Sequence, residues 1–223
     1  MAGQPKHRQI ADELRGQINR GELAPGAQLP SEAGRGSFVR QRRHLVYRPQ
    51  EDFQPRPASP EMDAFMTARL EEGRVPSQTI EVAIVTPPHD VAERLKLAGD
   101  ALAVVRRRVR SLDGEPYFIN DSYFPLDLAS GTEIMNPTDI ARGASTVLAE
   151  HGYHQARALD EIYVRMPTPD EVHRLNLGPG TPVAMHVITG FTGDGQPVRV
   201  AVNILPGDRH AIVWERERPA ATP

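Results

Sequence analysis

Arginine at alternate positions is the strongest chemical signal in this sequence. Arg106, Arg108 and Arg110 are each separated by one residue within the segment 101–112. Successive side chains of a β-strand point to opposite faces, so a strand here places all three guanidinium groups on one face. Guanidinium binds phosphate or carboxylate through paired hydrogen bonds, and three neighbouring positive charges repel one another unless anions neutralise them. The spacing predicts either an anion-binding face or an exposed face paired with acidic residues of neighbouring strands.

Catalytic and metal-binding signals are weak by comparison. The chain has no cysteine, no Gly-x-Ser-x-Gly sequence and no phosphate-binding glycine loop of the Walker type. We interpret His186, on a predicted strand, as structural, and four other histidines lack metal-ligand spacing: His151, His154, His173 and His210. We therefore predict no enzymatic activity, no catalytic residue, no cofactor and no metal site.

Composition predicts a cytoplasmic protein with one basic end. The absence of cysteine fits a reducing compartment, and no apolar run reaches the length of a membrane span or a secretory signal. The net charge is −3, yet residues 1–50 hold 9 Lys and Arg against 4 Asp and Glu, a local charge of +5. The remainder holds 17 against 25, a local charge of −8. The basic end suits contact with phosphates, and a solvated basic linker fits it equally well.

The elements that must position the arginines follow from periodicity. Segments 101–112 and 117–124 alternate as strands around the turn Asp113-Gly114-Glu115-Pro116, which predicts a hairpin. Similar patterns predict further strands at 78–87, 156–166, 181–191, 197–205 and 210–215. Helical periodicity predicts helices at 7–20, 60–73, 88–97, 139–151 and 169–175. The expected fold is α+β, one mostly antiparallel six-stranded sheet with helices packed on a face.

The first fifty residues hold little to bury. In the predicted helix 7–20 only Ile10, Leu14 and Ile18 form an apolar stripe, and four prolines mark residues 48–60 as a linker. A lone short helix is marginally stable in water. We expect residues 1–50 to be mobile unless they dock on the rest of the chain or on a second subunit.

An ordered set of segments between Pro76 and Glu217 resembles the effector-sensing UTRA domain of HutC-subfamily, GntR-type bacterial regulators. The segments are Asp90–Leu97, Arg106–Pro116, Ser122–Pro125, Asp194–Val198 and Asn203–Arg209. The resemblance implies a chorismate-lyase-like sheet, a homodimer, and a small metabolite whose binding alters the affinity of the dimer for DNA.

The N-terminal segment resembles two parts of the winged helix-turn-helix of the same regulators. Residues 10–32 resemble its beginning and residues 34–40 its wing, with only Ala33 between them. The second helix and the recognition helix need roughly 30 residues, which this chain lacks. We predict a partial winged helix-turn-helix at 1–47, a linker and short helix at 48–75, an effector-binding domain at 76–217 and a disordered tail at 218–223.

The resemblance also suggests residues for an effector site. Arg108 and Arg110 match the ligand-contacting arginines of the family by their distance from Asp113-Gly114, and Arg106 shares their face. Asn120 stands where many members carry an acidic residue, and its amide suits a hydroxyl-bearing or amide-bearing ligand, although a strand Asn bonded to backbone fits too. Weaker candidates are Arg199, where relatives often have Glu, and Asn203 on the same face. We interpret Asp121 as a surface charge and Tyr123 as core or rim.

The sequence therefore predicts a metabolite-responsive transcriptional regulator in which a small anionic effector modulates DNA binding. The predicted DNA-contacting residues are Arg35, Ser37, Arg40, Arg42 and Arg43. Without a recognition helix these residues give only salt-sensitive phosphate contacts. The alternative is a non-DNA-binding effector domain that sequesters its ligand or forms heterodimers with full-length relatives.

Overall fold

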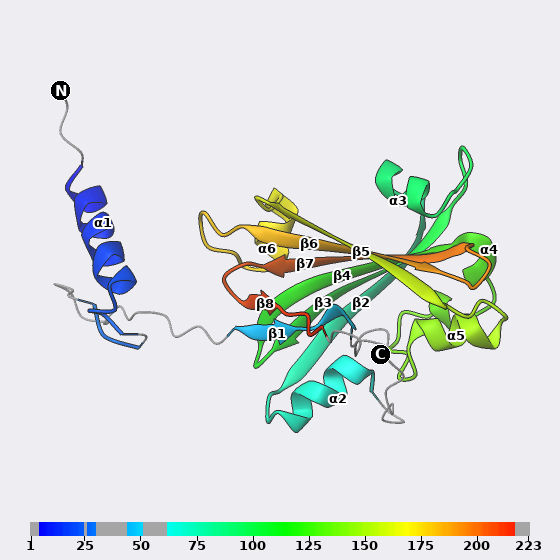
Figure 1. Cartoon of the computed structure of the whole chain (residues 1–223), viewed down its shortest axis with the longest axis horizontal. Helices are drawn as coiled ribbons and strands as arrows, with labels where there is room; N and C mark the ends of the chain where they lie inside the picture. Colours follow the sequence, from blue (N-terminus) through cyan, green and yellow to red (C-terminus); the bar gives the residue numbers. More distant parts are fainter. Residues whose placement is uncertain (1–4, 25, 30–43, 51–61, 217–223) are drawn as a thin grey trace, which may run out of the picture. The chain divides into compact units, whose positions relative to one another are not determined.

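The chain forms two compact units, Met1–His44 and Leu45–Pro223 (Figure 1). The computed structural model describes residues 5–24, 26–29, 44–50 and 62–216. The five predicted DNA-contacting residues between 35 and 43, the wing-like segment and the tail 218–223 lie outside the described residues. Within the described ranges, no helix is both long and apolar enough to cross a membrane.

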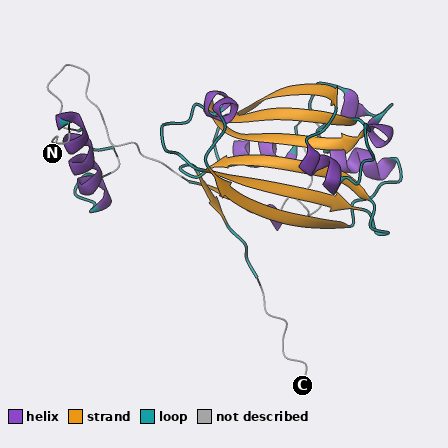
Figure 2. Cartoon of the chain, turned by 90° about the horizontal axis from the view of Figure 1, so that it is seen from above, coloured by secondary structure: helices purple, strands orange, loops and turns teal. Residues whose placement is uncertain are grey.

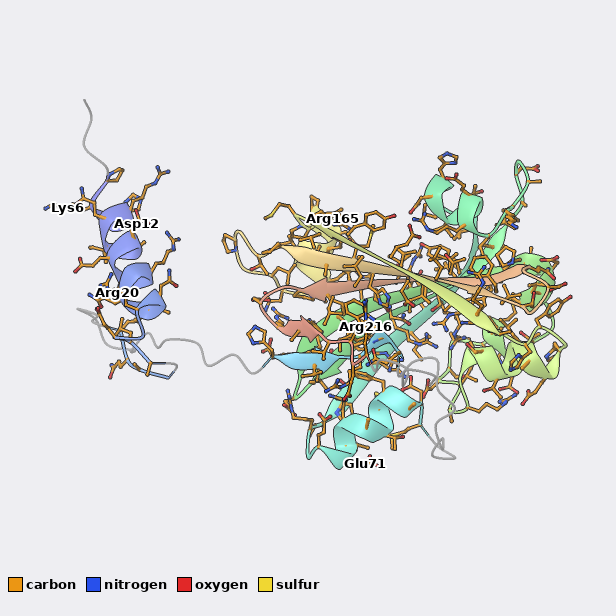
Figure 3. All side chains as sticks on the ribbon, in the orientation of Figure 1. Lys6, Asp12, Arg20, Glu71, Arg165 and Arg216 are labelled. Carbon is orange, nitrogen blue, oxygen red and sulfur yellow. The ribbon has the colours of Figure 1, made fainter. Side chains whose placement is uncertain are left out.

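The described part of the first unit contains one helix, α1 (Lys6–Asn19), close to the predicted bounds. Gly21 has a φ of 74°, the left-handed conformation typical of the residue after a helix. The helix buries no side chain, and Ile10 of its apolar stripe is 58% exposed. Charged residues such as Lys6, Asp12 and Arg20 extend outward around it (Figure 3). Mobility of this segment stays a prediction.

The second unit is built on the predicted six-stranded sheet, in which all neighbouring strands are antiparallel (Figure 2). The strand order is β2-β3-β4-β7-β6-β5. Their bounds are β2 (Pro76–Val85), β3 (Ala103–Leu112), β4 (Glu115–Pro125), β5 (Arg157–Arg165), β6 (Val183–Phe191) and β7 (Pro197–Pro206). The expected α+β fold is thus confirmed, and the three predicted arginines lie on a strand inside the sheet.

Two β-α-β-β units make up this sheet. The first consists of β2, α3 (His89–Arg94), β3 and β4, and the second of β5, α6 (Pro169–Arg174), β6 and β7. The hairpins of the two units meet at β4 and β7. In the first hairpin Asp113 and Gly114 both have positive φ, as a two-residue type I′ turn requires. The predicted hairpin is therefore confirmed, with a shorter turn than the predicted Asp113-Gly114-Glu115-Pro116, because β4 begins at Glu115.

Helices cover both faces of the sheet, whereas the prediction placed them on one. On one face α3 and α6 pack on the apolar residues of β3, β4, β6 and β7. On the other face two apolar clusters lie at opposite ends. One involves α4 (Leu126–Ala129), η2 (Glu133–Met135) and α5 (Ala144–Glu150). The second involves β1 (Leu45–Tyr47), α2 (Ala64–Glu71) and β8 (His210–Ile212).

Several bounds differ from the predicted ones for local reasons. The final strand, β8, pairs in parallel with β1 in a separate two-stranded sheet. Helix α2 begins after its N-cap, Asp63, and the start predicted near Pro60 lies outside the described residues. Helix α5 begins only after Gly143, whose φ of 83° interrupts the periodic stretch. The short elements α4 and η2 were not predicted, because three or four residues show no helical period.

Candidate functional site

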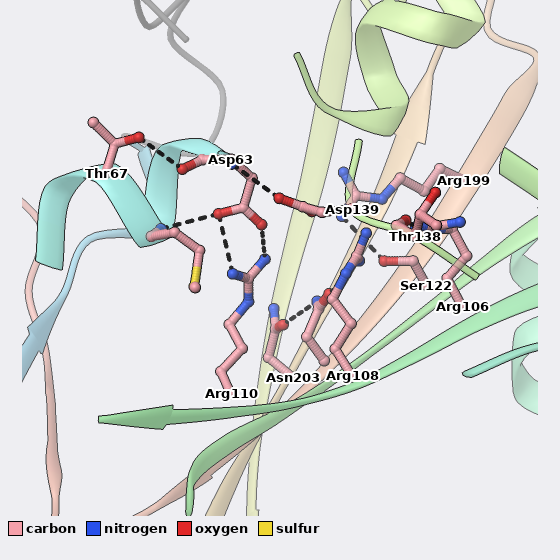
Figure 4. A network of polar contacts seen from close by, with 12 residues as sticks. Asp63, Thr67, Arg106, Arg108, Arg110, Ser122, Thr138, Asp139, Arg199 and Asn203 are labelled. Atoms are coloured by element: carbon pink, nitrogen blue, oxygen red, sulfur yellow. Dashed lines mark hydrogen bonds and ion pairs between the residues drawn. The ribbon is translucent and has the colours of Figure 1, made fainter. Parts of the chain in front are cut away.

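A band of buried polar side chains crosses the sheet between the two apolar clusters of the second face. In the register of the strands, Arg106 lies opposite Ser122, Arg108 opposite Asn120, and Asn120 opposite Asn203. All five side chains are buried. Figure 4 shows most of this band together with Asp63 and Asp139. We use the name arginine band for the five buried residues together with three neighbours on the same face: Arg106, Arg108, Asn120, Ser122 and Asn203, with Arg110, Arg199 and His186.

Arg106 is held by backbone carbonyl groups. Its two terminal nitrogens donate to the carbonyl oxygens of Ile134, Asn136 and Thr138, at 2.8, 2.5 and 2.7 Å. The side chain is fully buried, and burial lowers the pKa of its guanidinium. Arg106 therefore ties β3 to the turn around η2 through both terminal nitrogens, and only its buried Nε has no partner among the described residues.

Arg110 is paired with an internal carboxylate. Its terminal nitrogens donate to the two oxygens of Asp63 at 3.1 and 2.6 Å, and its guanidinium lies 4.6 Å from the centre of the Phe65 ring. Burial would raise the pKa of Asp63, but the charge and hydrogen bonds of Arg110 outweigh it and hold that pKa below its ordinary value. Arg110 thus makes with Asp63 the two-pronged contact expected with an anionic ligand.

Arg108 lies between these two arginines without a carboxylate partner among the described residues. One of its terminal nitrogens donates to Asn120 Oδ1 at 3.2 Å, and its buried Nε has no hydrogen-bond partner in the part of the chain that the structure describes. Burial, and after it the neighbouring charges of Arg110 and Arg106, together lower the pKa of its guanidinium to about 9. At neutral pH this is a buried positive charge whose compensation is incomplete. An anion bound at this position would neutralise the charge of Arg108.

The amides of Asn120 and Asn203 link Arg108 to β1. Asn120 Nδ2 donates to Asn203 Oδ1 at 2.6 Å, and Asn203 Nδ2 donates to the Tyr47 hydroxyl at 3.2 Å. The same hydroxyl lies 3.2 Å from Nδ1 of His186, whose Nε2 lies 2.7 Å from an oxygen of Asp160. A continuous row of polar contacts therefore runs from Arg108 to Tyr47 and on to the outer strand β5.

Arg199 adds a further positive charge at the border of the band. Its terminal nitrogens donate to Ser145 Oγ at 3.3 Å and to Ser122 Oγ at 3.2 Å. The first contact reaches α5 and the second reaches β4. The charge of Arg199 also lowers the pKa of Arg108.

The structure brings the six predicted effector-site residues together in the arginine band. They are Arg106, Arg108, Arg110, Asn120, Arg199 and Asn203. The face is buried, so the alternative of an exposed charged face does not apply, although Arg110 does have a carboxylate partner. Asn120 is bonded to side chains, Arg108 and Asn203. Whether these residues bind a ligand stays a prediction.

The interpretation of Asp121 as a surface charge was wrong. Its side chain is only 17% exposed and lies 3.8 Å from Arg174 on the face covered by α6. Burial raises the pKa of Asp121 to about 6, against the opposing charges of Arg174 and Arg107. Tyr123, on the same face, is buried in the core, in agreement with one of the two interpretations given for it.

Sequence reasoning missed Asp63, Tyr47 and Ser122. Asp63 stands just before a short apolar helix, and recognition of an N-cap could have singled it out. No sequence pattern indicates that Tyr47 contacts the arginine band, because this contact depends on the pairing of β1 with β8, which are far apart in the sequence.

Two named proteins are similar to this chain over nearly its whole length. It is 29% identical over 254 residues to "Uncharacterized HTH-type transcriptional regulator SCO4628" of Streptomyces coelicolor, which covers 96% of this chain and 94% of that protein. It is 26% identical to "HTH-type transcriptional regulator Rv0792c" of Mycobacterium tuberculosis, covering 96% and 92%. Since the first match spans 254 positions and this chain has 223 residues, the relative carries at least 31 residues that this chain lacks.

Solved structures and a family model agree with these matches. The fold resembles a protein described as a GntR-family transcriptional regulator, with a TM-score of 0.68, 20% identity and coverage of 96% of this chain and 98% of that one. It also resembles PhnF from Mycobacterium smegmatis, with a TM-score of 0.62, 17% identity and coverage of 96% and 91%. The UTRA domain model matches residues 71–211, more than half of the chain. The chain therefore belongs to the UTRA domain family, which confirms the predicted resemblance to GntR-type transcriptional regulators.

Proposed function

We propose that this protein is a transcriptional regulator whose DNA binding responds to a small anionic effector bound at Arg108 and Arg110. The observation that carries the proposal is the state of Arg108. Among the described residues this buried guanidinium has a single, neutral hydrogen-bond partner, and its pKa is lowered to about 9. A buried charge without full compensation costs stability, and such groups cluster at functional sites.

The neighbours of Arg108 suit an anion that also carries polar groups. Arginine contacts phosphate or carboxylate through paired hydrogen bonds. Asn120 and Asn203 supply amides that both donate and accept, which fits hydroxyl groups on the remainder of the ligand. Arg199, bonded to Ser122, contributes a further positive charge at the border of the band. The ligand class is therefore a small phosphorylated or carboxylated metabolite.

Regulation requires that the effector favour one arrangement of the protein over another. We propose a homodimer in which effector binding changes how the two N-terminal units are presented to DNA. Contact with DNA phosphates would come from the basic segment containing Arg35, Ser37, Arg40, Arg42 and Arg43. The relatives are named as transcriptional regulators and not as enzymes, so they do not support a catalytic role for the arginine band.

Calorimetry with inorganic phosphate tests the anion site. Phosphate is titrated at constant ionic strength into the full chain, into Arg108→Met and into the control Arg107→Met, which changes a more exposed arginine on the opposite face of the same strand. The proposal predicts saturable binding that Arg108→Met abolishes and Arg107→Met retains. Equal binding to all three proteins, or none to the unaltered chain, would overturn it.

The second candidate function is an effector domain that does not bind DNA specifically. The observation that favours it is the set of at least 31 positions that this chain lacks relative to its Streptomyces relative. It fits the predicted loss of the recognition helix. Titration against the duplex upstream of its own coding sequence and a scrambled duplex, at two salt concentrations, distinguishes the two. Clear discrimination supports the regulator, whereas equal and salt-sensitive binding supports the alternative.

A further inference from the structure

We propose that Asp63 is a built-in carboxylate ligand of the effector site, which an anionic effector displaces from Arg110, releasing helix α2. This inference rests on the proposed function and specifies how the site is regulated. It concerns a residue outside the matched span 71–211 of the UTRA domain.

The contact between Asp63 and Arg110 has the geometry of a bound anion. Both carboxylate oxygens face the two terminal nitrogens of Arg110, and the two side chains are only 12% and 10% exposed. Asp63 also feels the positive charge of Arg108, which has no carboxylate partner of its own among the described residues. The single carboxylate of Asp63 thus partly neutralises the charges of both Arg110 and Arg108. A phosphate or a second carboxylate group, bridging both, would neutralise them better than Asp63 alone.

Displacement of Asp63 would loosen α2, because the same carboxylate caps that helix. Asp63 Oδ1 accepts a hydrogen bond from the Met66 backbone N–H at 3.0 Å. The helix has only eight residues, none of them fully buried, so its cap matters to its stability, and the Asp63 backbone N–H adds a hydrogen bond to Asp139 Oδ2 at 3.1 Å. Its main apolar contact is Phe65, which packs edge-to-face on Phe118 and under Arg110. Loss of the Asp63 contact would therefore weaken both the start of α2 and its attachment to the sheet.

The position of Asp63 in the chain determines which part of the protein a release of α2 would affect. The described residues continue from β1 to Gln50 and resume at Met62, just before Asp63. Tyr47 contacts Asn203 of the arginine band, and Asp63 contacts Arg110 of the same band. Tyr47 and Asp63 thus both attach the chain to the effector site, and Leu45–Tyr47 follows the N-terminal unit directly in the sequence. An anion at Arg108 and Arg110 would free one of these two attachments.

Asp63→Asn tests competition between the carboxylate and an anion. Asparagine keeps the N-cap, because it is as good a cap as aspartate, but it removes the negative charge. The matched control is Glu81→Gln, which removes the same charge from the exposed ion pair with Arg107 on the opposite face. Inorganic phosphate is titrated into all three proteins by calorimetry at constant ionic strength. We expect binding at least about tenfold tighter in Asp63→Asn, about 1.4 kcal/mol, and less than about twofold different in Glu81→Gln.

Hydrogen exchange of the unaltered chain gives a second readout that needs no substitution. Saturating phosphate should speed exchange at the amides of Met66 and Thr67, whose partners are the side chain and the carbonyl of Asp63. Phosphate binding that depends on Arg108, with equal affinity in Asp63→Asn and unchanged exchange in α2, overturns the displacement and leaves the anion site standing. Absence of phosphate binding in all three proteins overturns the anion site and the displacement with it.

Discussion

Replacement of Arg108 by methionine should make the ligand-free protein more stable. Methionine keeps an unbranched apolar chain in the space of the arginine stem and removes the buried charge. Burial and neighbouring arginines lower the pKa of Arg108 to about 9. Each tenfold change in proton affinity is worth about 1.4 kcal/mol, so this lowering sets an upper limit of about 4 to 5 kcal/mol on the cost of the charge.

Removal of the arginine also destabilises the protein in one respect, which offsets part of the gain. Asn120 loses the donor at its Oδ1, which costs about 1 to 2 kcal/mol when the group stays buried. The expected net gain is about 1 to 3 kcal/mol in the free energy of unfolding, measured by urea denaturation of the ligand-free protein at neutral pH and low phosphate. Arg107→Met is the control, because it removes an exposed ion pair with Glu81 and a secondary attraction on Asp121, and it should change stability by less than about 1 kcal/mol. A loss of stability in Arg108→Met would refute the claim that this charge is incompletely compensated.

Three further predictions follow from neighbouring groups. Arg106→Met should destabilise the protein by about 1 to 3 kcal/mol in the same urea assay, because it removes the donors of one buried and two partly buried carbonyl groups. The same substitution is thus expected to destabilise at position 106 and to stabilise at position 108, and a gain in stability for Arg106→Met would contradict this expectation. Asp121 has a folded-state pKa raised to about 6, above its unfolded value of about 3.9, so the folded state binds the extra proton and the stability from this group falls as pH rises from about 4 to 6. Relative to Asp121→Asn, the unaltered chain should therefore lose up to about 3 kcal/mol across that range, and parallel pH profiles would rule this out. Tyr47→Phe should cost about 1 kcal/mol through the hydrogen bond that Asn203 donates to the hydroxyl, and an unchanged urea midpoint would argue against the polar row.

The sheet was predictable because its signals are local. Alternation along β3 and the Asp-Gly pair at 113–114 fix the strand, the hairpin and the common face of Arg106, Arg108 and Arg110. Asn120 and Asn203 were proposed from their positions in the resemblance, and the register places them opposite each other on β4 and β7. Spacing alone determines which side chains share a face of a strand.

The roles of the individual arginines were not predictable in the same way. Arg106 and Arg110 have equivalent positions in the pattern, yet one holds backbone carbonyls and the other holds a carboxylate from 47 residues earlier. Asp121 alternates like a surface residue, but α6 covers its face of the sheet. These outcomes depend on which helix packs over which end of the sheet, and the sequence period does not contain that information.

The most direct test of the account is the effect of an anion on DNA binding. Fluorescence anisotropy would measure affinity for the duplex upstream of the coding sequence, with and without inorganic phosphate at constant ionic strength, for the unaltered chain and Arg108→Met. Phosphate is expected to change the affinity of the unaltered chain for DNA by about tenfold, within the usual range of allosteric coupling, and to leave that of Arg108→Met unchanged. An equal phosphate effect on both proteins, or no effect on an unaltered chain that binds the duplex, would contradict it.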